Sequence, residues 1–413
     1  MTLLYPHKQE VYSLAKKYKI KRRKRNAFYK AGPRTLTVVL TTVAVVALIF
    51  VGISIYNPVY DFIMNIGRPS DPQVTIPDPV PTTTAPATTE PTQPPEPPPP
   101  EMRTGLKAVY LPIAQAADPA LLARFLDNMP QDTNAVMLDC KDAQGKLYYQ
   151  SSNAQAIAWE AMTENAIALT PIVEALNAKN IALIARMQTF SDPVAARGDR
   201  GANAITYSGS AMLWLDNTAA QGGKPWANPY APDMHRYLTA LAVELAENGA
   251  AMVVLDGVSF PVDMTGTASY GPLAATMSRQ ETLKTFVAGV TAVLEPLGVR
   301  TSVLLPATAV SHVNRDSRFG GNPLDMAGNH VMLSILPESL ATGYLAEGVF
   351  VTRPLLDIAA TVRDVLGHTA ANAPEGQEIM PLLRDSSGLS PQQVAAQLES
   401  AADTGCTEYI LYP

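Results

Sequence analysis

The chain has 413 residues, a length that suits two or three domains or one large α/β barrel with appended segments. It holds 31 basic and 37 acidic residues, yet 11 of the basic residues and only one of the acids lie in residues 1–34. The rest of the chain therefore carries 20 basic and 36 acidic side chains, which excludes it as a surface for nucleic acid, because phosphates require clustered positive charge.

Residues 1–34 are predicted to be a basic cytoplasmic segment in front of a transmembrane helix. The run from Leu36 to Tyr56 has 21 residues without a charge, and a helix of that length spans roughly 30 Å of hydrocarbon. Lys and Arg ahead of such a span hold that end inside. We therefore expect a single-pass cell-membrane protein with its helix over residues 35–56, its N-terminus cytoplasmic and its C-terminal domain extracytoplasmic. A cleaved signal peptide is the alternative, but no small-residue cleavage site follows the span.

Residues 57–103 are predicted to be a Pro/Thr-rich linker. The part from Arg68 to Pro100 contains 13 prolines and many threonines, with little to bury. Such a segment favours extended polyproline II at about 3.1 Å per residue, and we interpret it as a stalk with no binding role of its own.

The two cysteines, Cys140 and Cys406, are expected at opposite rims of the fold, so no disulfide is predicted. The histidines are scattered and no CxxC or HExxH spacing occurs, so we expect neither a metal nor a cofactor.

From residue 104 to residue 413, short apolar runs alternate with helical periods. The predicted strands are residues 105–112, 134–140, 181–187, 250–256, 300–306, 330–337, 378–385 and 406–413. The predicted helices are residues 118–129, 170–180, 232–249, 278–298, 353–367 and 390–405. Their start and stop signals are Asp118 with Pro119, Thr170 with Pro171, the capping box of Ser278 and Glu281, and Gly249.

Eight strands alternating with helices imply right-handed crossovers and a parallel sheet, and their number favours a closed (β/α)8 TIM barrel over residues 104–413. A doubly wound open sheet is the structural alternative. No Gly-rich phosphate loop follows the first strand, which argues against that alternative.

Polar side chains gather where the predicted strands end, and in such barrels these ends form the site. The residues at these positions are Asp139, Asp142, Arg186, Gln188, Asp256, Arg384, Asp385 and Tyr412. Glycoside hydrolysis uses one carboxylic acid to protonate the leaving oxygen and a second carboxylate to attack the sugar or activate water. Carboxylates with arginines and aromatic rings at one rim therefore indicate sugar chemistry.

The region from Gly105 to Pro413 resembles the bacterial "putative glycosyl hydrolase domain" family, (β/α)8 proteins distantly similar to the α-amylase group. The resemblance lies in the blocks GLKAVYLP, AVMLDCKDAQGKLYY, IALIARMQTFSDP, WANPYAPDMHRYLTALAVELAENGAAMVVLDGVSFP and PQQVAAQLESAADTGCTEYILYP. It implies that Asp256 occupies the nucleophile position. It also implies that Asp139, Lys141 and Asp142 form the second-strand acidic motif, and that Trp226 and Asn228 belong to the loop before the third long helix.

The sequence departs from that family after the fourth strand and in the fifth- and sixth-strand segments, and the sixth-strand segment, commonly rich in Tyr, Pro, Ser and His, reads MLSILPES here. Gly257, Val258 and Ser259 stand where the family usually has Tyr-Ile-Arg, and Leu304 stands where the fifth strand typically has an acid. A working acid–base pair must therefore come from other residues.

We predict a membrane-anchored extracytoplasmic glycoside hydrolase that acts on cell-wall or environmental polysaccharide, with a carbohydrate polymer as its partner. Its expected catalytic residues are Asp256 with Asp139 or Asp142, and Glu338 and Asp385 are fallback acids. The expected substrate-binding residues are Arg186, Lys141, Gln188, Trp226, Asn228, Arg384, Asp385 and Tyr412. The alternatives are a catalytically inactive glycan- or wall-binding barrel and a structural partner in an envelope complex.

Several of these residues also have a purely structural interpretation. Asp256 could cap the loop that follows it, and Asp139 and Asp142 could pair with Lys141 at the surface. Arg186 ends an apolar strand, where an unpaired charge is costly, so we expect it to pair with Asp139 or Asp256.

Overall fold

The computed structural model describes residues 101–413, apart from residues 311–315, 341–344, 347–348 and 351–355. The predicted cytoplasmic segment and transmembrane helix, and nearly all of the linker, lie outside the described residues. Within residues 101–413, less those gaps, no helix combines the length and hydrophobicity that a membrane span requires.

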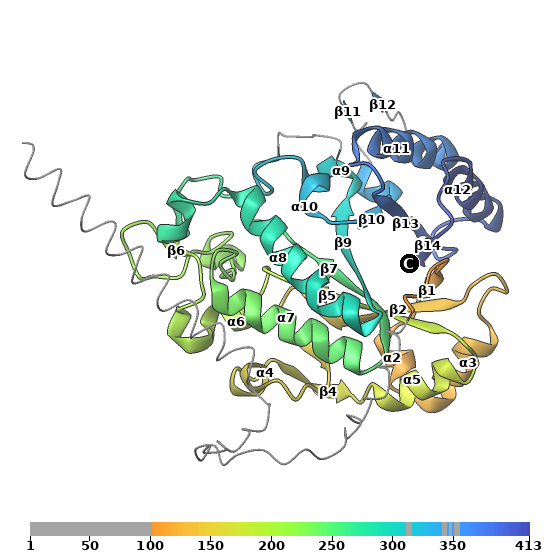
Figure 1. Ribbon diagram of the computed structural model, residues 1–413, viewed down its shortest axis with the longest axis horizontal. Helices are drawn as coiled ribbons and strands as arrows, with labels where there is room; N and C mark the ends of the chain where they lie inside the picture. The colour runs from red at the N-terminus through yellow and green to blue at the C-terminus, as the bar shows by residue number, and fades with distance from the viewer. Residues whose placement is uncertain (1–100, 311–315, 341–344, 347–348, 351–355) are drawn as a thin grey trace, which may run out of the picture. The chain divides into compact units, whose positions relative to one another are not determined.

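Eight parallel strands form a closed barrel, as the alternation of strands and helices predicts (Figure 1). The strands are β1 (Lys107–Tyr110), β2 (Ala135–Lys141), β5 (Ala182–Gln188), β7 (Ala250–Asp256), β9 (Arg300–Pro306), β10 (His330–Ser334), β13 (Glu378–Arg384) and β14 (Tyr409–Tyr412). The first strand, β1, pairs in parallel with both β2 and β14, so the sheet closes on itself. This pairing excludes the doubly wound open sheet.

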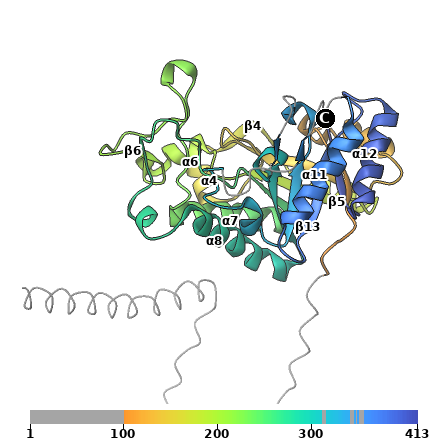
Figure 2. The ribbon, with the colours of Figure 1, turned by 90° about the horizontal axis from the view of Figure 1, so that it is seen from above.

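Helices cover the outside of the barrel between consecutive strands (Figures 1 and 2). The longer ones are α3 (Pro119–Asp127), α5 (Thr170–Asn177), α7 (Pro232–Glu247), α8 (Arg279–Leu294), α11 (Ile358–Asn372) and α12 (Pro391–Asp403). The shorter ones are α2 (Ile113–Ala116), α4 (Ala154–Ala158), α6 (Pro193–Arg197), α9 (Ala307–Val310) and α10 (Pro323–Met326).

Most of the predicted helix starts are confirmed, and two are wrong. Asp118 accepts hydrogen bonds from the first turn of α3, and Ser278 and Glu281 form the capping box of α8. Thr170 is the first residue of α5 rather than its cap, because the helix begins one residue earlier than the Thr-Pro pair suggests. The helix predicted from residue 353 begins at Ile358, where the carboxylate of Asp357 accepts from the Ala360 N–H and caps it.

Three small groups of strands accompany the barrel. The strand β3 (Leu147–Tyr149) runs antiparallel to β2, and β4 (Met162–Ile167) continues the sheet beyond it. The two-residue strands β6 (Thr206–Tyr207) and β8 (Ala268–Ser269) pair in the loops that follow β5 and β7. A further pair, β11 (Leu345–Ala346) and β12 (Val349–Phe350), lies between β10 and α11.

The barrel interior is a packed apolar layer, because alternate residues of each strand point inward. The inward apolar residues are Leu106, Ala108, Ala135, Met137, Ala182, Ile184, Met252, Val254, Leu304, Met332, Met380, Leu382 and Ile410. Continuing the same alternation toward the carboxyl ends of the strands reaches Tyr110, Asp139, Arg186, Asp256 and Tyr412. Because every second residue of a strand points inward, these polar side chains lie directly beyond the apolar interior, at the mouth of the barrel.

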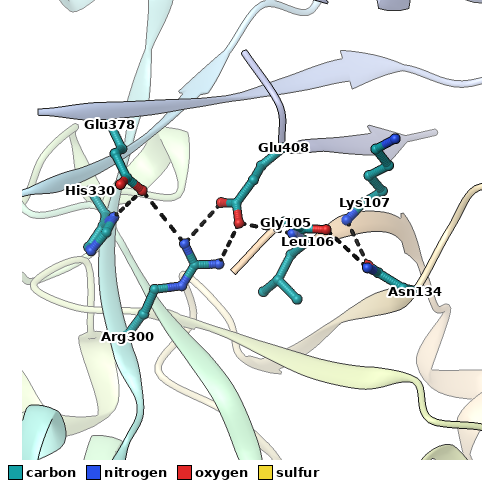
Figure 3. Close-up of polar contacts among 8 residues, drawn as sticks. All are labelled: Gly105, Leu106, Lys107, Asn134, Arg300, His330, Glu378 and Glu408. Atoms are coloured by element: carbon teal, nitrogen blue, oxygen red, sulfur yellow. Dashed lines mark hydrogen bonds and ion pairs between the residues drawn. The ribbon is translucent and has the colours of Figure 1, made fainter. Parts of the chain in front are cut away.

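The amino-terminal end of the barrel is closed by a buried ion pair (Figure 3). Arg300 starts β9 with its side chain 1% exposed, and its Nη1 and Nη2 donate to the two carboxylate oxygens of Glu408 at 3.0 and 2.9 Å. The Glu408 carboxylate also accepts from the Leu106 N–H at 2.9 Å. Glu378 lies 3.8 Å from Arg300 and 3.1 Å from His330. One guanidinium thus connects β9 with the two segments that close the barrel.

Replacing Arg300 by Met is expected to lower the free energy of unfolding by about 3–5 kcal/mol, because Glu408 would stay buried without its cation. The double variant Arg300→Met/Glu408→Gln should lose less, since the amide oxygen can still accept from Leu106 and no charge is left unpaired. Urea denaturation of the full-length protein measures both. Equal midpoints for the single and double variants would contradict this role.

Candidate active site at the barrel mouth

Asp139 and Arg186 form a two-pronged ion pair inside the carboxyl-terminal mouth of the barrel. They are neighbours across the β2–β5 pairing, and the Arg186 Nε and Nη2 lie 2.6 and 2.7 Å from the two carboxylate oxygens of Asp139. This geometry matches the planar fork of a guanidinium to a carboxylate and holds both side chains in place. The predicted pairing of Arg186 with Asp139 is confirmed.

Two tyrosines complete this cluster. The Tyr110 hydroxyl donates to Asp139 at 3.1 Å, and the Tyr412 hydroxyl accepts from Arg186 at 3.1 Å. The two rings meet edge to face with centroids 4.8 Å apart, and the Arg186 guanidinium lies over the Tyr412 ring. Burial, followed by the charge of Asp139, raises the pKa of Tyr110, so this phenol stays a hydrogen-bond donor at neutral pH.

Asp256 ends β7 on the same inner face and is partly exposed. Burial raises the pKa of its carboxyl above the ordinary value. The Arg186 charge and hydrogen bonds from the Gly257 N–H and the Gln188 amide act in the opposite direction, and the Asp139 charge raises the pKa further. The direct neighbour of Asp256 on β9 is Leu304, which is buried. An apolar side chain where the family has an acid therefore adds to the desolvation of Asp256.

The glycine after Asp256 has a structural cause. Gly257 has φ +67°, in the left-handed region, and a Cβ there would collide with Oε1 of Gln188. Because Gln188 is the residue opposite Asp256 on β5, its amide occupies the space over Gly257. The aromatic residue that the family usually has at this position is incompatible with this placement of Gln188.

Lys141 and Asp142 have partners away from the mouth. The Lys141 ammonium is fully buried and lies 2.9 Å from Asp192, so the alternative in which it pairs with Asp139 or Asp142 at the surface is wrong. Asp142 accepts from the Gln144 and Lys146 N–H groups and from the Tyr148 hydroxyl, and so shapes the turn between β2 and β3.

Trp226 and Asn228 lie in the long loop after β5. The Trp226 Nε1 donates to Asp216 at 3.1 Å, within the same loop. The Asn228 side chain donates to the Tyr270 carbonyl and accepts from the Tyr230 N–H, both at 3.0 Å. Asn228 thus ties the loops after β5 and β7 together.

Arg384 and Asp385 lie at the end of β13. Arg384 continues the inward alternation of Met380 and Leu382, and its guanidinium pairs with Glu338 at 3.1 Å. The Asp385 carboxylate accepts from the Ser387 N–H at 2.7 Å. A cavity of about 940 Å³ beside Asp385 lies against the outer wall of the barrel between α3 and α12, away from Asp256.

The structure therefore brings together Asp139, Arg186, Gln188, Asp256 and Tyr412 from the predicted set. It adds three residues that the sequence reasoning missed: Tyr110, Thr189 and Asp192. Tyr110 could have been found, because it follows Leu106 and Ala108 with a period of two. Nothing local in the sequence pointed to Thr189 or Asp192.

The part of the chain that the structure describes contains no cluster of three or more His, Cys, Asp or Glu side chains able to hold a metal ion. Both cysteines carry free thiols.

Residues 108–413 match the family described as "Putative glycosyl hydrolase domain", and the chain belongs to that family. No curated protein sequence matches the chain.

Several solved structures resemble the chain. A hypothetical protein from Ruminiclostridium thermocellum is 24% identical over 47% of this chain and 96% of its own, with a TM-score of 0.41. The catalytic domain of β-amylase from Paenibacillus polymyxa is 10% identical over 74% and 92%, with a TM-score of 0.44. Trehalose-6-phosphate hydrolase from Bacillus licheniformis is 12% identical over 75% and 64%, with a TM-score of 0.43. At these TM-scores the similarities support no conclusion about substrate or mechanism.

The raised pKa of Asp256 makes a prediction about stability. The folded protein holds this proton to higher pH than the unfolded chain does, so the carboxyl increasingly destabilises the fold as pH rises from its ordinary value of 3.8 through the folded pKa. Asp256→Asn is therefore expected to raise the thermal midpoint relative to wild type, and by more at pH 7 than at pH 4.

Asp263 provides a control of opposite sign. It is partly buried, but hydrogen bonds from Ala268 and Thr265 lower the pKa of its carboxyl. Asp263→Asn should therefore cost more stability at pH 7 than at pH 4. The same sign of pH dependence for both variants would contradict the environment assigned to Asp256.

Proposed function

We propose that the chain is a glycoside hydrolase that cleaves a polysaccharide in the mouth of the barrel, with Asp256 as the reacting carboxyl. The observation that carries the proposal is the placement of Asp256 at the end of β7, partly exposed, with a raised pKa and facing the Asp139–Arg186 pair. Two carboxyl groups in contrasting environments at one barrel mouth are what acid-assisted glycoside cleavage requires.

The environments suggest how the roles divide. A carboxyl with a raised pKa suits the general acid, so the burial that raises the pKa of Asp256 favours proton donation over the nucleophilic role implied by the family resemblance. Asp139 faces a guanidinium on both oxygens and supplies the negative charge that stabilises a cationic sugar.

Asp139 and Asp256 stand on strands separated by β5, with Asp139 level with Arg186 and Asp256 level with Gln188. The two residues are therefore offset by two positions along the strands, and both side chains point into the barrel. Two-carboxylate hydrolysis uses separations of about 5–9.5 Å, so the proposed division of roles requires the two carboxyl groups to converge across the mouth within that range.

The location and substrate follow from the sequence. The predicted helix over residues 35–56 would anchor the chain in the cell membrane, and the linker over residues 57–103 would hold the barrel outside the cell. A barrel in that position would meet cell-wall or environmental polysaccharide. We propose such a polymer as the substrate.

A second candidate, a glycan-binding barrel without catalysis, is favoured by two observations. Both oxygens of Asp139 are already bound by Arg186 and one of them also by Tyr110, and Leu304 replaces the acid of the fifth strand. Under this function the mouth would still bind sugar but would lack a free second carboxylate.

Asp256→Asn distinguishes the two candidates. Loss of the proton donor should reduce hydrolysis at least a hundredfold while glycan affinity stays within about twofold, because the amide has the same shape as the carboxyl. Reducing-end release from a panel of polysaccharides and peptidoglycan measures the first effect, and isothermal titration with the cleaved polymer measures the second.

Two results would contradict the hydrolase. Cleavage that is unaffected by Asp256→Asn removes Asp256 from the reaction. A wild-type protein that binds a polymer in the panel and cleaves none of them supports the glycan-binding barrel instead.

A further inference from the structure

The strongest unexplained feature outside the mouth is the ion pair of Lys141 and Asp192. Both side chains are 0% exposed, with Nζ 2.9 Å from the carboxylate. Asp192 also caps α6, accepting from the Ala195 N–H at 2.8 Å. Gly145 makes room for this carboxylate, because a Cβ there would overlap it. A side chain would not fit at residue 145, so the packing around this pair is specific.

The pair is linked to Asp256 through β5. The Lys141 ammonium donates to the carbonyl oxygen of Gln188 at 2.8 Å. Gln188 is the direct neighbour of Asp256 across the β5–β7 pairing, and its side-chain amide bonds the Asp256 carboxyl. The next residue, Thr189, donates from its N–H and its hydroxyl to the Asp256 carbonyl, both at 2.9 Å. Asp256 is therefore held at its backbone and its side chain by two consecutive residues.

The orientation of the Gln188 amide carries further information. Its Oε1 is buried over Gly257 without a hydrogen-bond partner, and an unpaired buried acceptor is costly. The Gln188 amide also hydrogen-bonds the Asp256 carboxyl and so acts to lower its pKa.

We propose that the buried Lys141–Asp192 ion pair fixes Gln188, and through it the Asp256 carboxyl, so that these three residues are positioning residues for the reaction at the barrel mouth. The role in hydrolysis rests on the proposed function, whereas the positioning itself does not. A buried ion pair contributes little net stability compared with an apolar pair of the same size, so stability alone does not explain this one.

Two variants test the chain of contacts at different points. Gln188→Met removes the amide and keeps the length of the side chain. Lys141→Met/Asp192→Asn removes both charges and keeps an oxygen to cap α6. The double variant is preferred to Lys141→Met, which would leave Asp192 buried without a cation and strongly destabilise the fold.

The matched control is Arg300→Met/Glu408→Gln, which removes the other buried ion pair, at the opposite end of the barrel. It changes stability without touching β5 or Asp256. In all of these variants Arg186 and Asp139, the charged groups that also face Asp256, are left in place.

The first measurement is the titration of the Asp256 carboxyl by carbon-13 NMR in the full-length protein, assigned by its loss in Asp256→Asn. Gln188→Met should raise the titration midpoint, because a hydrogen bond to the charged form is lost. The Lys141→Met/Asp192→Asn variant should shift the midpoint in the same direction. The control variant should titrate like wild type.

The second measurement is hydrolysis of whichever polymer wild type cleaves. A carboxyl displaced by about 1 Å can cost roughly a hundredfold in rate, so kcat should fall by that amount in both test variants while KM changes by less than about threefold. The control variant should retain the wild-type kcat.

The two measurements distinguish failure of the positioning role from failure of the proposed hydrolase function. If the Lys141→Met/Asp192→Asn variant is folded and Asp256 titrates as in wild type, the positioning role is overturned, whatever the activity. If the midpoint shifts as expected but wild type cleaves no polymer, the positioning role stands and the hydrolase is overturned. If the control shifts the midpoint equally, the effect is general loosening of the barrel and the proposal is wrong.

Discussion

Closure of the sheet is the constraint on which everything else in this structure depends. A parallel barrel closes only when its first and last strands pair, and here β1 lies between β2 and β14. At the amino-terminal end of the barrel, the Glu408 carboxylate accepts hydrogen bonds from the Leu106 N–H and from the Arg300 guanidinium (Figure 3). The pairing of β1 with both β2 and β14 fixes the register of the closing strands, and the largely buried Glu408 carboxylate ties them to Arg300 at the start of β9. That register decides which side chains face inward at the mouth.

The same register explains the chemistry of the mouth. Most strands present apolar residues to the middle of the barrel, and β2, β5 and β7 among them end in a polar residue that points inward. These polar groups therefore lie directly above a layer of apolar side chains. Asp139 meets a cation there, whereas Asp256 has Leu304 as its direct neighbour on one side and the Gln188 amide on the other. One carboxylate is therefore charge-paired, and burial raises the pKa of the other. The contrast arises from neighbours, since the two residues are chemically identical.

The departures of this chain from its family now have physical consequences. Glycine at position 257 is favoured by its left-handed φ of +67° and leaves room for the Gln188 side chain, and Leu304 makes the surroundings of Asp256 more apolar. Both changes bear on the same carboxyl, one by fixing its hydrogen-bond donor and one by desolvating it. In place of the aromatic, basic and acidic groups of the family, burial, the Arg186 charge and hydrogen bonds from Gly257 and Gln188 act on the pKa of Asp256.

The sequence by itself determined the eight strands, the closed barrel, most helix starts and the ends at which Asp139, Arg186 and Asp256 stand, because these depend on periods of two and 3.6 and on local capping chemistry. It also led to the pairing of Arg186 with an acid, since an unpaired charge at the end of an apolar strand is too costly. Only the tertiary structure decided the partner of Lys141, which lies in the same motif as Asp139 but pairs with the distant Asp192. The contacts that Gln188 and Thr189 make to Asp256 could likewise not be predicted from the sequence. Such contacts join segments far apart in the chain, and their geometry exists only once the barrel has closed and brought β2, β5 and β7 side by side.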